Sequence, residues 1–166
     1  MKKFVFIIAM IFIASGAFAQ SPLVKGGKQL NLGVGLSGWG VPVYAGLDFG
    51  VHPDMSLGLE VSFRQYKEHW KDYYYHHNII GFSGNFNYHF NRILNITPKW
   101  DFYAGANLGF YVWNSPDYYP GDHSSGLGLG GQLGGRYYLT DKVGLNLEFG
   151  GGNAFSGGKF GVSILF

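Results

Sequence analysis

Histidine and acidic side chains gather in two polar stretches of the chain, and both residue types can bind a metal ion. The stretches are Tyr66 to His77, with Glu68, His69, Asp72, His76 and His77, and Trp113 to Ser125, with Asp122 and His123. Imidazole and carboxylate groups bind divalent transition metals, provided that the two stretches converge in the fold. In an extended chain, however, the adjacent His76 and His77 point to opposite faces. We therefore expect the candidate ligands His69, His76 and His77 to be ordinary polar surface residues, with no bound metal.

Two glycine patterns, Gly33–Gly38 and Gly126–Gly131, match the string of the dinucleotide-binding fingerprint. That fingerprint requires a helix after the glycines, because the helix N-terminus holds the pyrophosphate. Trp39 to Pro42 follows the first pattern, and an alternating segment continues through the second. We expect no cofactor.

The composition is poor in charge and rich in aromatic residues and glycine. Only 13% of the 166 residues are charged, whereas 19% are aromatic and 28 residues are glycine. Without Lys2 and Lys3, the 12 basic residues fall to ten and balance the 10 acidic residues. A neutral chain without a basic cluster argues against nucleic acid as a partner. Because the chain has no cysteine, it has neither a disulfide framework nor a thiolate metal site.

The first 19 residues have the pattern of a secretory signal peptide. Lys2 and Lys3 precede the apolar run Phe4–Ile13, and Ala17-Phe18-Ala19 forms a small-x-small cleavage site. The alternative is a transmembrane anchor, but the apolar run is short of the roughly 20 residues that a helical span needs. We expect a signal peptide at 1–19 and one domain at 20–166, which is a length suited to a single domain.

The remainder of the chain alternates between apolar and small or polar residues, which is typical of β-strands with one apolar face. Helical periodicity is not seen. Eight such segments can be counted, each of about nine to eleven residues, the length that a tilted strand needs to cross a bilayer. They are 30–37, 43–51, 55–64, 80–90, 100–110, 127–139, 143–150 and 159–166.

The small and polar face distinguishes between two kinds of barrel. In a secreted soluble barrel, such as a lipocalin, this face would point to water and would be rich in charged residues and threonine. Here it consists of Gly, Asn, Ser and Tyr with scattered charge. Such residues fit the narrow interior of an eight-stranded barrel, with the apolar face turned toward lipid. The sequence therefore predicts an all-β, eight-stranded antiparallel up-and-down transmembrane β-barrel.

The last strand ends on an aromatic residue. Its apolar face carries Phe160, Val162, Ile164 and Phe166, which alternate with Lys159, Gly161, Ser163 and Leu165. This pattern resembles the C-terminal assembly signal of bacterial outer-membrane β-barrels. Together with the eight strands, it makes the chain from residue 20 onward similar to the small OmpA/OmpX-type barrel families, without a periplasmic domain after the barrel.

The resemblance implies a bacterial outer-membrane protein that contacts outer-membrane lipid and the barrel assembly machinery. It also implies a monomer whose role is structural or surface-interactive, without an open pore and without enzymatic activity. Outer-membrane barrels have short periplasmic turns and longer outer loops. The two long polar connections, 66–77 and 113–125, are therefore where an extracellular ligand is expected to bind.

One alternative is enzymatic. The run His123-Ser124-Ser125 resembles the His-x-Ser element of lipid A deacylases, which are also eight-stranded outer-membrane barrels. His123 and Ser125 would then be the base and nucleophile of a lipid A-modifying hydrolase at the outer rim, with a carboxylate to orient the histidine. The residues that flank this element in the family are absent here.

Charged residues of both signs fall on the inward face of the strands. We expect paired ions inside the barrel, centred on Arg136, with Glu148 as a diagonal neighbour across the sheet and Glu60 across the interior. The set is Asp48, Glu60, Arg64, Arg136 and Glu148.

Overall fold

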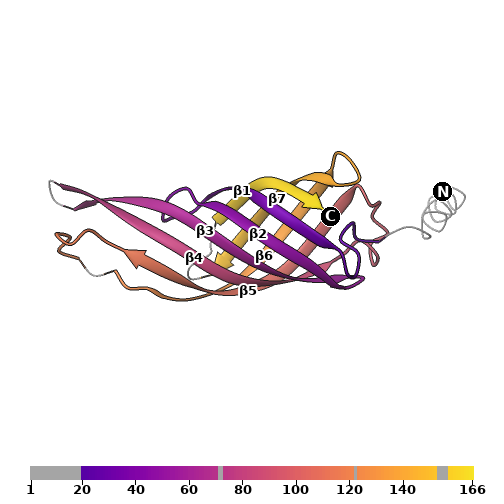
Figure 1. The fold of residues 1–166 in the computed structure, drawn as a ribbon, viewed down its shortest axis with the longest axis horizontal. Coiled ribbons are helices and arrows are strands. Elements are labelled where there is room, and N and C mark those ends of the chain that lie inside the picture. Colours follow the sequence, from indigo (N-terminus) through magenta and orange to yellow (C-terminus); the bar gives the residue numbers. More distant parts are fainter. Residues whose placement is uncertain (1–19, 71–72, 122, 153–156) are drawn as a thin grey trace, which may run out of the picture.

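Eight antiparallel strands close into one up-and-down barrel in the computed structural model, which describes residues 20–70, 73–121, 123–152 and 157–166 (Figure 1). Each strand pairs with its neighbours in sequence, and β1 pairs with β8 to close the barrel. This confirms the predicted fold class. The strands are β1 (Lys28–Leu36), β2 (Val43–His52), β3 (Met55–Trp70), β4 (Tyr73–His89), β5 (Trp100–Asn114), β6 (Gly126–Tyr138), β7 (Val143–Gly152) and β8 (Gly157–Leu165).

The apolar face of the strands points outward and the polar face points inward. Leu59 on β3 and Leu133 on β6 are 67% and 60% exposed, whereas Asp48 on β2 and Arg136 on β6 are 3% and 2% exposed. Side chains alternate between the two faces along a strand, so each register fixes which residues fill the interior. The core of this protein is therefore polar.

Strands β3 and β4 are longer than the sequence predicted, with 16 and 17 residues. Residues 66–70 and 73–77 belong to the expected loop 66–77 but lie in these two strands, which pair with each other as far as Trp70 and Tyr73. Cross-strand contacts explain the extension, since His69 packs on Tyr74 with ring centroids 4.7 Å apart and the Lys67 ammonium lies 4.1 Å from the centroid of the Tyr74 ring. Strand β5 likewise runs on to Asn114.

The outward face of this hairpin changes character along its length. Phe63 and Ile80 form its last apolar pair, and the next outward pair is Gln65 with Asn78, whose side chains are hydrogen-bonded at 3.3 Å. Beyond it the outward residues are charged, polar or tyrosine. The hairpin therefore extends past the apolar band of the barrel, and Figure 1 shows β3 and β4 projecting at the end away from the C-terminus.

The segment before β1 packs against the opposite end of the barrel. Leu23 is 1% exposed, and the backbone of Gly26 and Gly27 is hydrogen-bonded to Gly50 of β2. The expected signal peptide, 1–19, lies outside the described residues.

Glycine on the inward face makes room for large neighbours. A Cβ at Gly134 would lie 2.2 Å from Cζ of Tyr103, its cross-strand partner, and one at Gly33 would lie 2.8 Å from the hydroxyl of Tyr44. Both tyrosine rings thus lie over glycine, which explains why an interior rich in glycine is still filled. No helix in the described part of the chain is long and apolar enough to cross a bilayer.

Candidate functional site

Arg136 forms the centre of a buried ion-pair cluster in the barrel interior. Its guanidinium donates from Nη1 to Asp101 at 2.9 Å and from Nη2 to Asp48 at 3.0 Å. The Tyr103 ring covers it, 4.2 Å from Cζ to the ring centroid. Each carboxylate has a second partner, because Asn31 donates to Asp48 at 2.9 Å and His89 lies 2.7 Å from Asp101. Extra hydrogen bonds of this kind are what make a buried ion pair tolerable.

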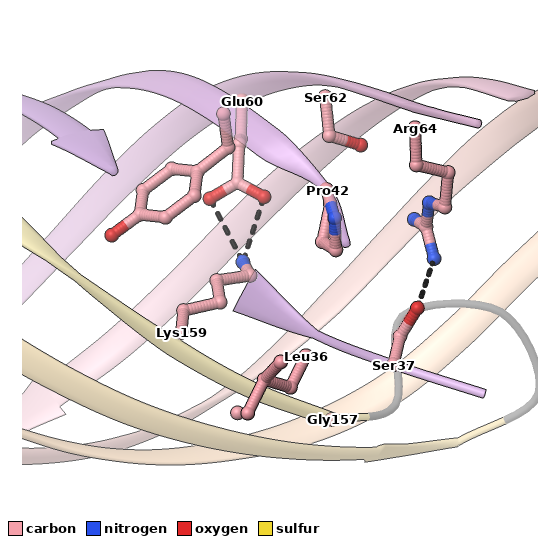
Figure 2. A pocket seen from close by; sticks show the side chains of 10 residues that line it. Leu36, Ser37, Pro42, Glu60, Ser62, Arg64, Gly157 and Lys159 are labelled. Carbon is pink, nitrogen blue, oxygen red and sulfur yellow. Dashed lines mark hydrogen bonds and ion pairs between the residues drawn. The ribbon is translucent and has the colours of Figure 1, made fainter. Parts of the chain in front are cut away.

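A second cluster surrounds Lys159 of β8. Its ammonium contacts both oxygens of Glu60, at 2.7 and 2.9 Å (Figure 2). It also lies 3.2 Å from Glu148. The hydroxyl of Tyr103 donates to Glu148 at 2.8 Å and so links the two clusters.

The predicted pairing of Arg136 with Glu148 and Glu60 was therefore wrong. Arg136 lies opposite Asn146 of β7 on one side and directly opposite Asp101 of β5 on the other. Glu148 lies directly opposite Lys159 of β8. Directly opposed side chains are closer than diagonal ones, so these pairs form instead. Asp101 and Lys159 are not in the set of residues expected to form the interior ion pairs, although the alternation of their strands also turns them inward.

Arg64 is also buried, at 4% exposure, but it has a different environment. Its Nη1 donates to the hydroxyl of Ser37 at 3.1 Å (Figure 2). Among the described residues Arg64 forms no ion pair with a carboxylate, and Glu60 pairs with Lys159 instead. Arg64 lines a cavity of about 20 Å³ together with Glu60 and Lys159. A second interior cavity, beside Arg136, has a volume of about 10 Å³. Each has room for about one water molecule.

A third cluster lies beyond the apolar band, where the β3–β4 hairpin meets the connection between β5 and β6. Glu68, His77 and His123 each direct one atom to a common point, and these atoms lie within 4.8 Å of one another. Oε2 of Glu68 is 2.9 Å from Nε2 of His123 and 3.3 Å from Nε2 of His77. The hydroxyl of Tyr119 donates to the same oxygen at 2.8 Å. We call Glu68, His77 and His123 the outer cluster.

Aromatic rings enclose the outer cluster. His123 stacks between Trp113 and Tyr119, with centroid separations of 4.3 and 5.3 Å, and Tyr66 stacks on His77 at 6.0 Å. Burial lowers the pKa of His77, which favours its neutral form. The hydrogen bond from His123 lowers the pKa of Glu68, which favours the carboxylate. Desolvation and the bond to Glu68 raise the pKa of Tyr119 to about 12.

Only one of the three predicted metal candidates belongs to the outer cluster. The expectation that His77 is a surface residue was wrong, because His77 points inward and is fully buried. His69 and His76 are exposed on the outward face of the hairpin, as expected. The opposite orientation of His76 and His77 was expected from an extended chain. What the sequence did not show is that the inward member meets Glu68 and His123.

His123 and Ser125 do not form the arrangement that a hydrolase needs. Nε2 of His123 contacts Glu68 and Tyr119, and the hydroxyl of Ser125 accepts from the backbone N–H of Trp113 at 2.9 Å. Among the described residues no hydrogen bond joins His123 to Ser125. A general base must reach the proton of its nucleophile, so this geometry does not favour acyl transfer.

The expected assembly residues lie on the outward face of β8. Phe160 is 55% and Phe166 is 63% exposed, while Val162 and Ile164 are half-buried. Phe166 also pairs with β1, since its N–H donates to the carbonyl of Lys28 at 3.0 Å.

No known protein-family pattern matches the sequence, and no curated protein is significantly similar to it. Solved structures do match. The outer membrane protein OprG from Pseudomonas aeruginosa has a TM-score of 0.65 at 10% identity, over 88% of this chain and 99% of OprG. The N-terminal β-barrel domain of Pseudomonas aeruginosa OprF has a TM-score of 0.55 at 17% identity, over 86% and 98% of the two chains. Neisserial surface protein A has a TM-score of 0.55 at 15% identity, over 84% and 95%.

The chain therefore has the fold of the small eight-stranded outer-membrane β-barrels. These identities are low, so the likeness concerns the fold. Any particular role must be argued from the residues of this chain.

Proposed function

We propose that this chain is a monomeric bacterial outer-membrane β-barrel with a closed interior, whose role is structural or depends on contacts made by its outer end. The single observation that carries the proposal is the combination of an apolar exterior with a hydrogen-bonded polar interior. Large exposed side chains such as Leu59, Leu133 and Phe149 lie around the whole barrel. Soluble monomers rarely expose apolar patches of more than a few hundred Å², so lipid is the solvent that suits this surface.

The proposal includes how the chain reaches the membrane. Residues 1–19 would be removed as a signal peptide, and the outward face of β8 would be recognised by the barrel assembly machinery. By strand parity, the β2–β3, β4–β5 and β6–β7 connections lie at the same end of the barrel as the C-terminus. In the proposed orientation this end is periplasmic. The β3–β4 hairpin and the connection 115–125 would then face the outside of the cell, where an extracellular ligand could reach them.

The closed interior has a direct electrical consequence. We expect the purified barrel to show no steady conductance in planar bilayers, because the interior cavities beside Arg64 and Arg136 have volumes of only about 20 and 10 Å³. A known porin added to the same bilayers would show that insertion and current are detectable. A stable large pore formed by this chain would contradict the closed-barrel proposal.

The proposed orientation can be tested with epitope tags. A tag inserted between Trp70 and Tyr73, in the β3–β4 hairpin, should bind antibody on intact cells. The matched control is a tag placed at Asp141, in the short connection after β6, which should bind antibody only after lysis. The reverse result would invert the topology and would move the outer cluster to the periplasmic side.

A further inference from the structure

The outer cluster has the residues and the geometry of a metal site. Two imidazole nitrogens, Nε2 of His77 and Nε2 of His123, approach the same carboxylate oxygen of Glu68 at 3.3 and 2.9 Å. The three residues come from three parts of the chain: β3, β4 and the connection before β6. We propose that Glu68, His77 and His123 bind a divalent transition-metal ion, of which Zn²⁺ is the representative.

His77 provides an independent observation. Its side chain is 0% exposed, and Nε2 makes no hydrogen bond, although Nδ1 lies 2.9 Å from the hydroxyl of Ser115. A buried polar atom without a hydrogen bond is costly and needs an explanation. If Nδ1–H donates to Ser115, the lone pair of Nε2 points to Glu68 and His123. An imidazole held through one nitrogen while the other faces carboxylate and imidazole is the arrangement of a metal-bound histidine.

The two separations from the Glu68 oxygen suit a small ion, and the two histidine nitrogens lie within 4.8 Å of each other. Zn²⁺ binds His nitrogen and carboxylate oxygen at about 2.0 to 2.2 Å in tetrahedral geometry, which places neighbouring ligand atoms about 3.3 to 3.5 Å apart. The separations of 2.9 and 3.3 Å from Glu68 need little adjustment to reach this range. The fourth position would be filled by water or by the hydroxyl of Tyr119, which lies 3.1 Å from Nε2 of His123.

The donor set also selects among metals. Imidazole suits Zn²⁺, Cu²⁺ and Ni²⁺, whereas Ca²⁺ and Mg²⁺ prefer sites made entirely of oxygen. Glu68 and His123 have side chains that are 21% and 27% exposed, so an ion has access from the solvent. A bound ion would tie the projecting hairpin to the 115–125 connection and would fix the shape of the outer end of the barrel.

The test is a titration of the folded chain, carrying no polyhistidine tag, with ZnCl₂ in detergent micelles by calorimetry. We expect one ion per chain, and we expect Mg²⁺ and Ca²⁺ not to compete. Since the loss of even an outer-shell partner weakens metal binding by about 10- to 100-fold, His77→Ala and His123→Ala should each weaken it at least tenfold. The matched controls are His76→Ala and His69→Ala, which remove exposed histidines of the same hairpin and should leave binding unchanged.

The variant Glu68→Gln and the absorption spectrum of bound Co²⁺ test the site even if the alanine variants do not fold. Glu68→Gln preserves the shape of the side chain but removes its charge, so it should weaken Zn²⁺ binding even if an alanine variant does not fold. Binding of Co²⁺ should give the absorption spectrum of a tetrahedral nitrogen and oxygen site in the parent chain and not in Glu68→Gln. Absence of saturable Zn²⁺ binding, or equal loss in His76→Ala and His77→Ala, would overturn the proposal. None of these results depends on the orientation of the barrel or on its role in the cell.

Discussion

Replacement of Arg136 by leucine is expected to lower the free energy of unfolding by about 3 to 5 kcal/mol, which is the usual effect of removing one partner from a buried ion pair. The guanidinium is 2% exposed and contacts both Asp48 and Asp101. Without it, the two carboxylates keep only Asn31 and His89 as close polar partners in the described interior. The measurement is urea-induced unfolding of the barrel in lipid vesicles, followed by tryptophan fluorescence and by the heat-dependent shift in gel mobility.

Two comparisons show whether the lost charge pairing is the cause. Changing Asp48 and Asp101 to asparagine together with Arg136→Leu removes all three charges, so this triple variant should be more stable than Arg136→Leu alone. In double-mutant cycles, the coupling of Arg136 with Asp101 should exceed its coupling with Glu148, which contacts Lys159 instead. An Arg136→Leu barrel that unfolds at the same urea concentration as the parent would refute this account of the interior.

Deletion of Phe166 is expected to leave the protein secreted but largely uninserted, so that a protease-sensitive species accumulates in the periplasm. Phe166 provides an exposed aromatic ring on the outward face and a backbone pair with Lys28 at the seam between β1 and β8. Both are lost in the deletion. The measurement is the fraction of the protein that is found in the outer membrane and that shows the heat-dependent shift in gel mobility of a folded barrel.

Point variants separate the ring from the backbone pair. Phe166→Leu keeps the backbone pair with Lys28 but has no ring, so it should also insert poorly if the ring is recognised during assembly. Phe166→Tyr keeps a ring and should insert nearly as well as the parent. Normal outer-membrane yield of the deletion variant would show that the end of β8 is not the recognition element.

The sequence predicted the number of strands and which face of each strand points into the barrel. It could do so because side chains along a strand alternate strictly between two faces. Shifting a strand by one residue would bring Leu57, Leu59 and Val61 into the interior and would turn Glu60 toward lipid. The free-energy cost of such a shift is large, so the pattern alone predicted which residues of β3 face outward and which face inward. The observed burial of these residues agrees. The same reasoning holds for the other strands of the barrel.

The extent of the β3–β4 hairpin could not be read in this way. Beyond Phe63 and Ile80 the hairpin leaves the apolar band, and its outward face becomes as polar as its surroundings. The alternation between apolar and polar residues then disappears, although strand pairing continues. Lys67, Tyr74 and their neighbours therefore looked like a charged aromatic loop, whereas cross-strand contacts between side chains hold them in strands.

Which inward residues become partners was decided only when the barrel closed. Arg136 and Asp48 are 88 residues apart, and Glu68 and His123 are 55 residues apart, yet their side chains are in contact. The period of two determined that Arg136 and Asp48 face inward, because that is a property of one strand, whereas Glu68 and His123 lay in stretches expected to be loops. It could not determine their partners, because contact across the interior depends on the register and curvature of all eight strands together.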